Sequence, residues 1–503
     1  MKKNYKKLVA LFMTLAMVIS LAGCKKTTED NKSTDNGTVQ ETKPTIEATP
    51  TKEETPTDDK EVVTIKWVAV GSGMPTNYEA WKKHINSYLE EKIGVNIEFE
   101  VVSWGDWDNR RSVIVNTNED YDILFTNLNT FAGDVNLGAF MDISEIVKNQ
   151  TPGLYSHIPE SYWEASSIGG KIYAVPTYKD SSVTQYFVWD KELLSKYNLD
   201  VSGLHNIEDL TETLKTIKDG ENAPSFVLHK DGLVTVVGNY YDGMGAGLMP
   251  VGVNFTDESR KVVSTLEQPE VMAGLKQLHQ WYEDGIINSD AATLAEAPKY
   301  RKCFVAQGWS GAAITTWGPQ MGVEAIAVQY GDTIVSNDSV QGSMNCISSS
   351  SKHPDKALQL LELVNTDSYV RDALYYGLEG ENFNYTADGK IEKINEEWTM
   401  AGYTQGTFFN VSQLATADFN QWEEVQELNA NATPSVLLGT SFDWTLVEDE
   451  LANCIEIWNR YKPEVFTGTT DPETTIPVIM EELRAAGFDR IVEEAQKQID
   501  AAK

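Results

Sequence analysis

Residues 65–81 read IKWVAVGSGMPTNYEAW, and this stretch decides how the folded region begins. An apolar run ends at Gly71-Ser72-Gly73, and after Pro75 the apolar residues follow the spacing of a helix. A strand, a glycine turn and a helix in this order are typical of α/β folds, in which ligands often bind near such turns. The stretch therefore predicts a βα unit and marks its turn as a candidate ligand contact.

The same alternation continues beyond this unit. The pattern predicts strands at Val63–Val70, Val95–Val102 and Tyr121–Asn127, with a helix at Tyr78–Lys92 and another after the second strand. Strands joined by helical crossovers form a parallel sheet, and ligands bind beyond the carboxyl ends of such strands. The ligand contacts predicted at these ends are Gly71, Ser72, Trp104, Asp106, Trp107, Thr126 and Asn127.

Length and charge narrow the classes of protein. A chain of 503 residues, 41% hydrophobic, is expected to form more than one domain. Its formal net charge of −34 repels phosphate backbones, which argues against a nucleic-acid partner. The simplest reading of this charge is solubility.

The amino terminus reads as a targeting signal. Four lysines precede an apolar run at Leu8–Leu21, which is too short to span a bilayer comfortably and ends in Leu21-Ala22-Gly23-Cys24. Small residues before a cysteine at this place resemble the bacterial lipoprotein signal, in which residues 1–23 are removed and Cys24 is lipidated. An ordinary signal peptide or a short anchor is the alternative reading.

Residues 24–61 are predicted to be a disordered membrane tether. They are rich in Thr, Asp, Glu, Lys and Pro and contain few large apolar residues, so they cannot bury enough surface to offset the entropy of ordering. No later segment is long and apolar enough to be predicted as a membrane span.

Cysteine and histidine spacing predicts no metal site and no cofactor. Cys303, Cys346 and Cys454 are widely separated, and the six histidines are scattered. Buried free thiols are the expected state of the three cysteines.

Three patterns in the sequence are typical of other functions. Gly308–Ala312 (GWSGA) is close to the nucleophile elbow of serine hydrolases, but the residues after it do not read as a helix, and only His353 lies downstream. A glycoside hydrolase would need two facing carboxylates, for which Asp106, Asp108 and Asp180 are candidates. Asn198–Asp209 resembles a calcium loop, although a turn followed by a helix cap explains it equally well.

Several stretches together resemble one family, the extracellular solute-binding lipoproteins of ABC importers. They include the lipoprotein signal, TIKWVAVGSG, YDILFTN, the run from Gly169 to Leu194, Gln341–Tyr385, TQGTFFN and the last 30 residues before Ala501. The resemblance is greatest to a Gram-positive branch whose carboxyl-terminal region is a domain of unknown function. It covers residues 62–500, and the order of the motifs is more specific than any one of them.

The resemblance implies a two-lobed, type II periplasmic-binding-protein-like α/β fold, each lobe a mostly parallel sheet flanked by helices. Lobe one would comprise residues 62–175 and 346–395. Lobe two would comprise 176–345 and the start of 396–503, whose final helices would pack near the hinge. Such proteins catalyse nothing; they close around a solute and present it to permease subunits.

Further ligand contacts are implied by this resemblance. They are Tyr178, Trp309, Trp317, Tyr375, Tyr376 and Trp422. Aromatic rings stack on the apolar faces of sugars, and the relatives' usual solutes are sugars, so an oligosaccharide is the expected ligand. The residues themselves do not separate saccharide from peptide. The resemblance also implies a monomer that is lipid-anchored at the outer face of the cell membrane.

Overall fold

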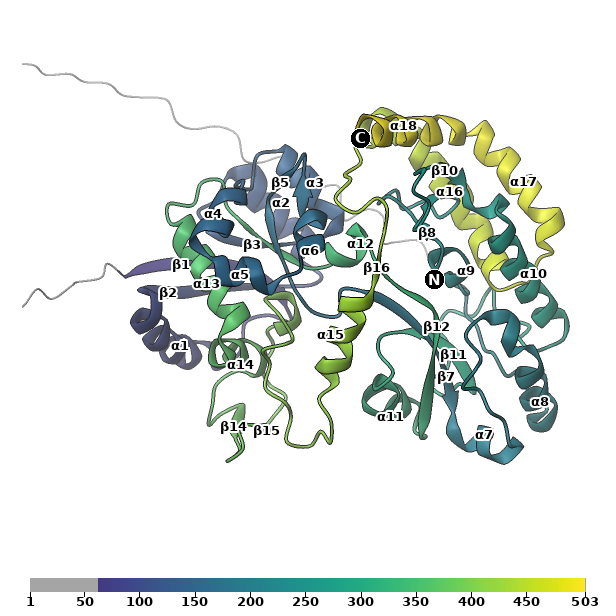
Figure 1. Cartoon of the computed structure of the whole chain (residues 1–503), viewed down its shortest axis with the longest axis horizontal. Coiled ribbons are helices and arrows are strands. Elements are labelled where there is room, and N and C mark those ends of the chain that lie inside the picture. Colours follow the sequence, from purple (N-terminus) through teal and green to yellow (C-terminus); the bar gives the residue numbers. More distant parts are fainter. Residues whose placement is uncertain (1–61, 503) are drawn as a thin grey trace, which may run out of the picture. The chain divides into compact units, whose positions relative to one another are not determined.

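The computed structural model describes residues 62–502. The predicted signal peptide (1–23), the lipidation site Cys24 and the predicted tether (24–61) lie outside these residues. Between residues 62 and 502 the chain folds into two lobes, each with its own sheet and its own hydrophobic core (Figure 1).

Lobe one begins with the predicted alternation. β1 (Val63–Gly71), α1 (Tyr78–Ile93) and β2 (Val95–Ser103) are followed by α2 (Trp107–Thr117) and β3 (Ile123–Thr126). β1 pairs in parallel with β2 and with β3, which confirms the predicted βαβ arrangement. The five-stranded sheet has the order β2-β1-β3-β13-β6, and β13 (Met344–Ile347) is antiparallel to both of its neighbours, β3 and β6 (Ala174–Pro176).

Helix α1 shows why this alternation is readable in the sequence. Its buried residues are Tyr78, Trp81, Ile85 and Leu89, spaced three or four apart so that they face the sheet. Gly94 ends the helix at φ 67°, a left-handed conformation that glycine adopts without steric cost.

The rest of lobe one covers the two faces and the edge of this sheet. Its remaining elements are α3 (Leu128–Asn136), α4 (Ser144–Gln150), α5 (Pro152–His157), α6 (Glu160–Ala165), β4 (Ser167–Ile168), β5 (Lys171–Ile172), α13 (Pro354–Thr366), α14 (Ser368–Tyr376), β14 (Phe383–Tyr385) and β15 (Ile391–Lys393).

The sheet of lobe two is mostly antiparallel, so the prediction of a mostly parallel sheet is wrong for this lobe. β7 (Val183–Asp190) lies between β11 (Cys303–Gln307) and β12 (Ala325–Val335) and is antiparallel to both. Only the two residues of β16 (Thr433–Pro434) pair in parallel with β12. The partners of β7 are more than 110 residues away, and an apolar run alone does not reveal the direction of a distant partner.

The other elements of lobe two surround this sheet and a smaller one of order β10-β9-β8. They are α7 (Lys191–Tyr197), α8 (Thr211–Glu221), α9 (Thr235–Gly238), β8 (Tyr241–Asp242), β9 (Val251–Asn254), β10 (Val262–Ser264), α10 (Pro269–Glu283) and α11 (Gly318–Met321). α12 (Asn337–Val340) lies in the segment that connects β12 to β13.

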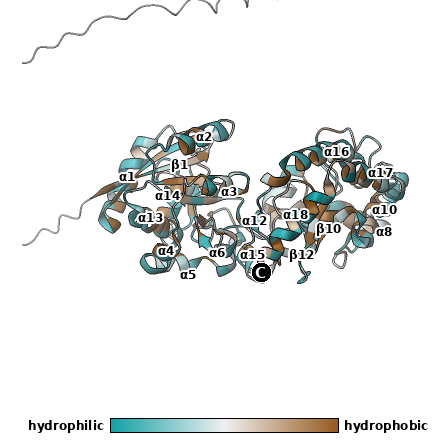
Figure 2. Ribbon diagram, turned by 90° about the horizontal axis from the view of Figure 1, so that it is seen from above, coloured by the Kyte–Doolittle hydropathy of each residue, from teal (hydrophilic) through white to brown (hydrophobic). Residues whose placement is uncertain are grey.

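The carboxyl-terminal helices belong to the core of lobe two. α16 (Glu448–Phe466), α17 (Pro472–Ala485) and α18 (Phe488–Ala501) bury Trp458, Ile479 and Ile491 in the same cluster as Leu278 of α10. In Figure 2 the helices carry both hydrophilic and hydrophobic colours, as helices with one buried face do.

The boundary predicted at residue 396 is also placed too early. Residues 399–407 lie against lobe one: Met400 bridges to Gly71, and the side chain of Arg371 binds three carbonyl groups of this segment. α15 (Gln421–Asn431) follows and leads through β16 into lobe two.

The competing patterns take ordinary structural roles. Ala313–Trp317 forms a π-helical turn after GWSGA, so the expectation that no helix follows this motif was wrong. Asp209 and Asn206 form a capping box at the start of a 3₁₀ turn, which is the alternative reading of the calcium-like segment. Cys303, Cys346 and Cys454 are buried free thiols, as predicted.

Candidate functional site

The Gly71-Ser72-Gly73 turn is hydrogen-bonded to another segment of the protein, residues 399–401. Ser72 N donates to Thr399 O at 3.0 Å, and the Thr399 hydroxyl donates to Gly73 O at 2.8 Å. A Cβ at Gly71 would lie 3.0 Å from Thr399 O, so glycine permits the approach of residues 399–401. The backbone groups that were expected to contact a ligand are therefore already bonded, and the exposed side chain of Ser72 is what the turn still offers.

The loop after β2 contains one exposed and one buried tryptophan. Trp104 is 47% exposed, whereas Trp107 is 3% exposed and packs edge-on against Phe125 with ring centroids 5.2 Å apart. Trp107 is thus a core residue, and the prediction that it contacts ligand is corrected by its burial. Asp106 is exposed and accepts a hydrogen bond from the Ser103 hydroxyl at 2.7 Å.

The two polar residues at the end of β3 are tied to α3 by hydrogen bonds. Thr126 is fully buried, and its hydroxyl lies 3.2 Å from that of Thr130, so it cannot reach a solute in this arrangement. Asn127 is the N-cap of α3, and its side chain accepts from Asn129 N at 3.1 Å. Asn127 itself is partly buried.

Most of the other predicted aromatic contacts are packed inside the protein. Tyr178, Trp317, Tyr376 and Trp422 are each less than one-tenth exposed. Tyr178 meets Phe409, and Trp422 lies 4.3 Å from Phe408 between ring centroids. Their burial corrects the expectation that they face a ligand, because a ring enclosed on both faces offers no stacking surface.

Trp309 and Tyr375 are half-buried and lie in one aromatic cluster. Trp309 of lobe two lies 6.0 Å from Trp422 between ring centroids, and Tyr375 of lobe one lies 6.0 Å from Phe408. α15 thus packs against aromatic rings from both lobes through Trp422. Both half-buried rings keep part of their surface for a solute.

Tyr403 is the aromatic residue that the sequence analysis missed. It is 44% exposed, although its neighbours from Met400 to Phe408 are all buried. Its ring is nearly parallel to that of Trp104, with an interplanar angle of 10° and centroids 6.4 Å apart. We call these two residues the aromatic pair.

A cavity of about 450 Å³ opens beside the two segments that connect β6 to β7 and β12 to β13. We call it the cleft cavity. Its polar lining residues are Lys179, Asp180, Ser181, Asn239, Asp242, Gln307, Asp332, Ser336, Asp338 and Ser339, with apolar surface from Val183, Tyr241, Phe255 and Ile334. Its volume is typical of a site for a small organic ligand.

The cleft cavity is acidic. Four aspartates line it against one lysine, and that lysine, Lys179, already pairs with Asp180 at 2.7 Å. Burial, with a contribution from the nearby Asp242, raises the pKa of Asp338 to about 6. Burial also raises the pKa of Asp242, whose carboxylate accepts from the Ser435 hydroxyl at 2.6 Å and from Met244 N at 2.9 Å. Asp338 and Asp332 are both exposed at the cavity, so their carboxylates are open to accept a bond from a ligand.

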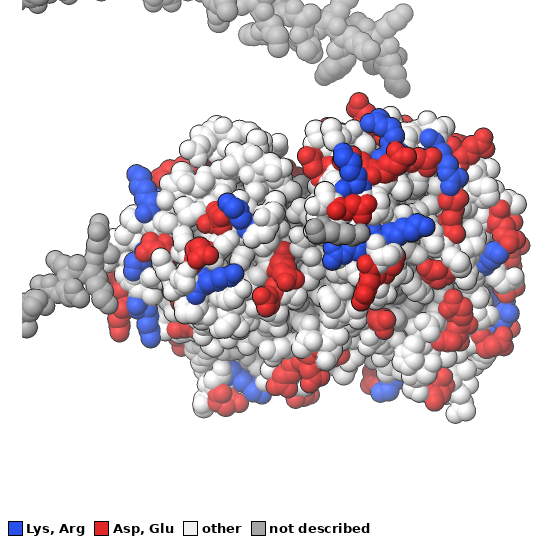
Figure 3. All heavy atoms as spheres, turned by 45° about the horizontal axis from the view of Figure 1, so that its top comes forward, with Lys and Arg blue, Asp and Glu red and all other residues white. Residues whose placement is uncertain are grey.

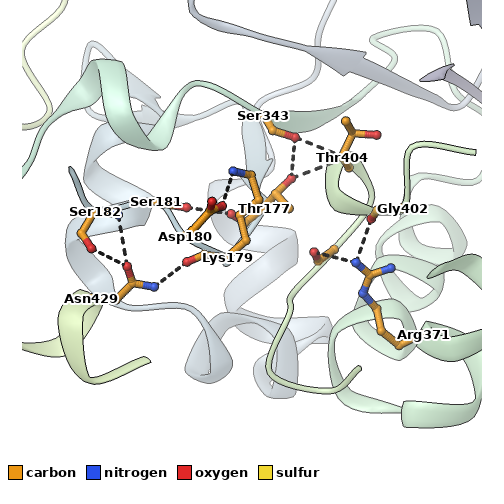
Figure 4. A network of polar contacts seen from close by, with 11 residues as sticks. Thr177, Lys179, Asp180, Ser181, Ser182, Ser343, Arg371, Gly402, Thr404 and Asn429 are labelled. Carbon is orange, nitrogen blue, oxygen red and sulfur yellow. Dashed lines mark hydrogen bonds and ion pairs between the residues drawn. The ribbon is translucent and has the colours of Figure 1, made fainter. Parts of the chain in front are cut away.

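Hydrogen bonds fix the chain beside the cavity (Figure 4). Asn429 of α15 accepts from Ser182 N and from the Ser182 hydroxyl, and its amide donates to Lys179 O. On the other side, Thr404 O accepts from Asn345 at 3.0 Å and from Ser343 at 3.4 Å. The two segments that connect β6 to β7 and β12 to β13 therefore hold both α15 and the loop that bears Tyr403.

A second hollow adjoins the first through Asp332, which lines both. Glu424 of α15 lies there and accepts from Ser310 N and Gly311 N at 2.7 and 3.0 Å. These backbone groups belong to GWSGA, so the motif binds a carboxylate of its own chain. Ser310 has no histidine among the residues that line this hollow, which removes the geometric support for a hydrolase elbow.

Charged side chains of both signs lie on the surface of the protein. Figure 3 shows aspartate and glutamate scattered over the visible face, with lysine and arginine among them. No group of three or more His, Cys, Asp or Glu residues suited to a metal was found among residues 62–502. None of the helices in that range is both long and apolar enough to cross a bilayer.

Residues 71–371 match the model of the bacterial extracellular solute-binding protein family, and residues 436–503 match a domain of unknown function, DUF3502. The first match covers more than half of the chain, so the protein belongs to the bacterial extracellular solute-binding protein family.

Relatives with known names are similar over nearly the whole chain. A carbohydrate ABC transporter substrate-binding protein of Streptococcus pneumoniae is 29% identical over 99% of this chain and 98% of its own. The crystal structure of the N-glycan transport solute binding protein (NgtS) of Streptococcus pneumoniae is 26% identical and covers 87% of this chain and 98% of its own, with a TM-score of 0.77. Alginate-binding protein AlgQ2, at 17% identity over 88% of this chain and 98% of its own, with a TM-score of 0.54, shares the fold.

Proposed function

We propose that this protein is the carbohydrate-binding component of an ABC importer and that it captures an oligosaccharide between its lobes. The observation that carries the proposal is the chemistry of the protein's open surfaces: a cavity is lined by carboxylates, amides and hydroxyls, and two aromatic rings of lobe one, Trp104 and Tyr403, are exposed. Sugars present hydroxyl groups at their rims and C–H groups on their faces, and such a lining complements both.

The named relatives support the same class of ligand. The similar Streptococcus pneumoniae protein is a carbohydrate transporter component, and NgtS has been crystallised with Man1GlcNAc and with Man5GlcNAc. The permease and ATPase subunits would be separate chains, because an importer needs both and this sequence has no nucleotide-binding loop.

Capture is proposed to proceed by closure of the lobes. The TM-score with NgtS falls from 0.77 to 0.65 and 0.62 in the Man1GlcNAc and Man5GlcNAc complexes. A rearrangement between lobes on saccharide binding would account for this fall. Lobe one then comprises residues 62–176 and 343–411, and lobe two comprises 183–335 and 433–502, with α12 and α15 between them. Closure would be favoured by contacts that the ligand makes with both lobes at once.

Family membership places the protein outside the cell, and we propose that a lipid on Cys24 holds it at the membrane. Residues 24–61 would serve as the tether, and the protein would act as a monomer. Labelling with radioactive palmitate should mark the wild type and leave Cys24→Ala unlabelled and released into the medium. Equal labelling of both would contradict the anchor.

Two measurements test the function. A thermal-shift panel of mono- and oligosaccharides, with peptides as the alternative class, should raise the melting temperature for a saccharide series, because ligands that bind only the native state stabilise it. A shift with peptides alone would overturn the substrate class. Incubation with the bound saccharide should release no new reducing ends; their release would mean a glycoside hydrolase.

A further inference from the structure

We propose that residues 435–440, where the domain of unknown function begins, are the pivot about which the two lobes close. We call this segment the strap. The inference rests on the proposed function and adds to it the part of the molecule that keeps the lobes aligned while they move. It gives the domain of unknown function a role in solute capture that needs no contact with the solute.

The strap places neighbouring side chains against the cores of both lobes. Leu437 is 1% exposed and belongs to the core of lobe two, whereas Leu438 packs against the core of lobe one. A Cβ on Gly439 would lie 3.3 Å from Glu164 O of α6 in lobe one, so the backbone of the strap approaches that lobe closely. Because apolar surface is buried on both sides, separating the strap from either lobe would cost free energy.

Hydrogen bonds tie the start of the strap to lobe two. The Ser435 hydroxyl donates to Asp242 at 2.6 Å, and Ser435 N donates to Val335 O at 2.8 Å. Val436 N donates to Phe255 O at 3.0 Å. Beyond the strap, α16, α17 and α18 are buried in the core of lobe two, so the domain of unknown function should move with that lobe.

Asn337 binds the strap to a segment that connects the lobes. It lies in α12, between β12 and β13, and its amide donates to Leu437 O at 3.2 Å and to Thr440 O at 2.8 Å. Its side-chain oxygen accepts from Gly439 N at 2.9 Å. Both the donor and the acceptor groups of this side chain therefore bind the backbone of the strap, which an apolar side chain could not do.

The place of the strap beside the connections between the lobes makes it a pivot. Within residues 62–502 the chain connects the lobes three times, between β6 and β7, between β12 and β13, and through α15. These connections are bonded to one another: the hydroxyl oxygens of Thr177 and Ser343 lie 2.9 Å apart, and Ser182 N donates to Asn429 at 3.1 Å (Figure 4).

Because the lengths of these connections are fixed, the axis about which a lobe rotates must pass close to them, and atoms near an axis move least. Asn337 holds the strap at one of the three. The strap can therefore keep its contacts with both lobes while the cleft closes.

A disulfide between the strap and lobe one tests this directly. A Cβ on Gly439 would lie 3.6 Å from Glu164 Cβ, a separation found in disulfides. Cys303, Cys346 and Cys454 are buried, so they should not compete for the new bond. The double variant Gly439→Cys, Glu164→Cys is oxidised, and Man5GlcNAc is titrated into it by calorimetry before and after reduction. Small-angle X-ray scattering measures the radius of gyration with and without the saccharide.

A pivot that keeps its contacts predicts that the oxidised and reduced forms bind within about threefold of each other and that both become more compact on binding. Loss of binding in the oxidised form, regained on reduction, would mean that the strap leaves lobe one during closure and would overturn the pivot. Failure of the disulfide to form would contradict the contact between Gly439 and Glu164.

A second variant, Asn337→Ala, asks whether the lobes need the strap. It should bind Man5GlcNAc about tenfold more weakly, because a smaller fraction of the molecules holds the lobes in the arrangement that binds. Adding the oxidised disulfide to Asn337→Ala should restore binding to within about threefold of the wild type. Asn149→Ala is the matched control and should match the wild type, since Asn149 is exposed and its side chain donates to Glu145 of its own helix, α4.

Unchanged binding in Asn337→Ala, or no recovery with the disulfide, would overturn the pivot; melting temperatures verify that each variant is folded. The wild type is titrated first, and another saccharide from the panel above replaces Man5GlcNAc if only that one binds. If the wild type binds no saccharide, the proposed function itself fails, a result that is reached before any variant is made.

Discussion

The two lobes present different chemistry to the proposed ligand. Lobe one offers exposed aromatic rings at the carboxyl ends of its parallel strands. The backbone of the glycine turn at these strand ends is already hydrogen-bonded to the chain's own segment 399–407. Lobe two and the two segments that connect it to lobe one, between β6 and β7 and between β12 and β13, offer carboxylates and amides around a cavity. The comparison indicates a division of labour, in which one lobe supplies apolar contact and the other supplies hydrogen bonds that fix orientation.

The largest effect should come from removing the internal support of lobe one. Arg371 is fully buried, and burial lowers its pKa to about 10, so it stays charged at neutral pH. Arg371→Met would leave three buried carbonyls without their donor and should cost about 3 kcal/mol or more in the free energy of unfolding, measured with urea.

The matched control for Arg371 is Arg484, whose ion pair with Glu267 is at the surface. Arg484→Met should cost less than about 1 kcal/mol, because exposed ion pairs are weak and screened. Equal costs in the two variants would mean that Arg371 does not support the loop that bears Tyr403.

A smaller effect should follow from crowding the strand end of lobe one. In Gly71→Ala, the new Cβ would lie 2.8 Å from Val101 Cγ1 and 3.0 Å from Thr399 O. Overpacking of this kind should lower the free energy of unfolding by about 1–3 kcal/mol. Gly105→Ala is the control, since nothing lies within 4 Å of its Cβ position; it should change stability by less than about 0.5 kcal/mol. A neutral Gly71→Ala would contradict the close approach of residues 399–401.

The smallest effect on stability, and the most specific, concerns the carboxylate of Asp338 in the cavity, because this side chain is exposed and solvent screens its interactions. The pKa of Asp338 is about 6 in the folded protein, above the usual value of about 3.9 in an unfolded chain. Between these values the folded state binds more protons than the unfolded state, so stability falls as the pH rises from about 4 to 6. Asp338→Asn should therefore melt at a higher temperature than the wild type at pH 7 and at a similar temperature at pH 4.

The same substitution should weaken saccharide binding about tenfold at pH 7, because an ionised acceptor makes the stronger hydrogen bond. Asp388→Asn is the control, since the hydroxyl of Thr386 lowers the pKa of Asp388 and its loss should destabilise the protein at pH 7. If Asp338→Asn lowered the melting temperature at pH 7, or left binding unchanged, Asp338 would not be the carboxylate through which the cavity binds the saccharide.

The sequence predicted the part of the fold that depends on local pattern. The strands and helix between Val63 and Ser103 follow from alternation and from the spacing of Trp81, Ile85 and Leu89. The antiparallel pairing of β7 could not be predicted, because it depends on partners more than 110 residues away. Periodicity describes one segment, whereas pairing direction depends on the path of the whole chain.

The site was predicted less well for the same reason. Trp104 was found because it follows a strand, but Trp107 follows the same strand and points into the core. Tyr403 and Asp338 carry no local signal, since their exposure results from contacts that bury every neighbour of Tyr403 and gather four aspartates around one cavity. The segment that begins at residue 399 also hydrogen-bonds to the backbone of the glycine turn, where the sequence predicted a ligand contact.

The most direct test of the account is a calorimetric titration of the wild-type protein with Man5GlcNAc, followed by mass spectrometry of the recovered saccharide. The account predicts saturable binding at one site per chain and recovery of the saccharide unchanged. No binding of Man5GlcNAc or of any other oligosaccharide, or recovery of a shortened product, would contradict capture for transport.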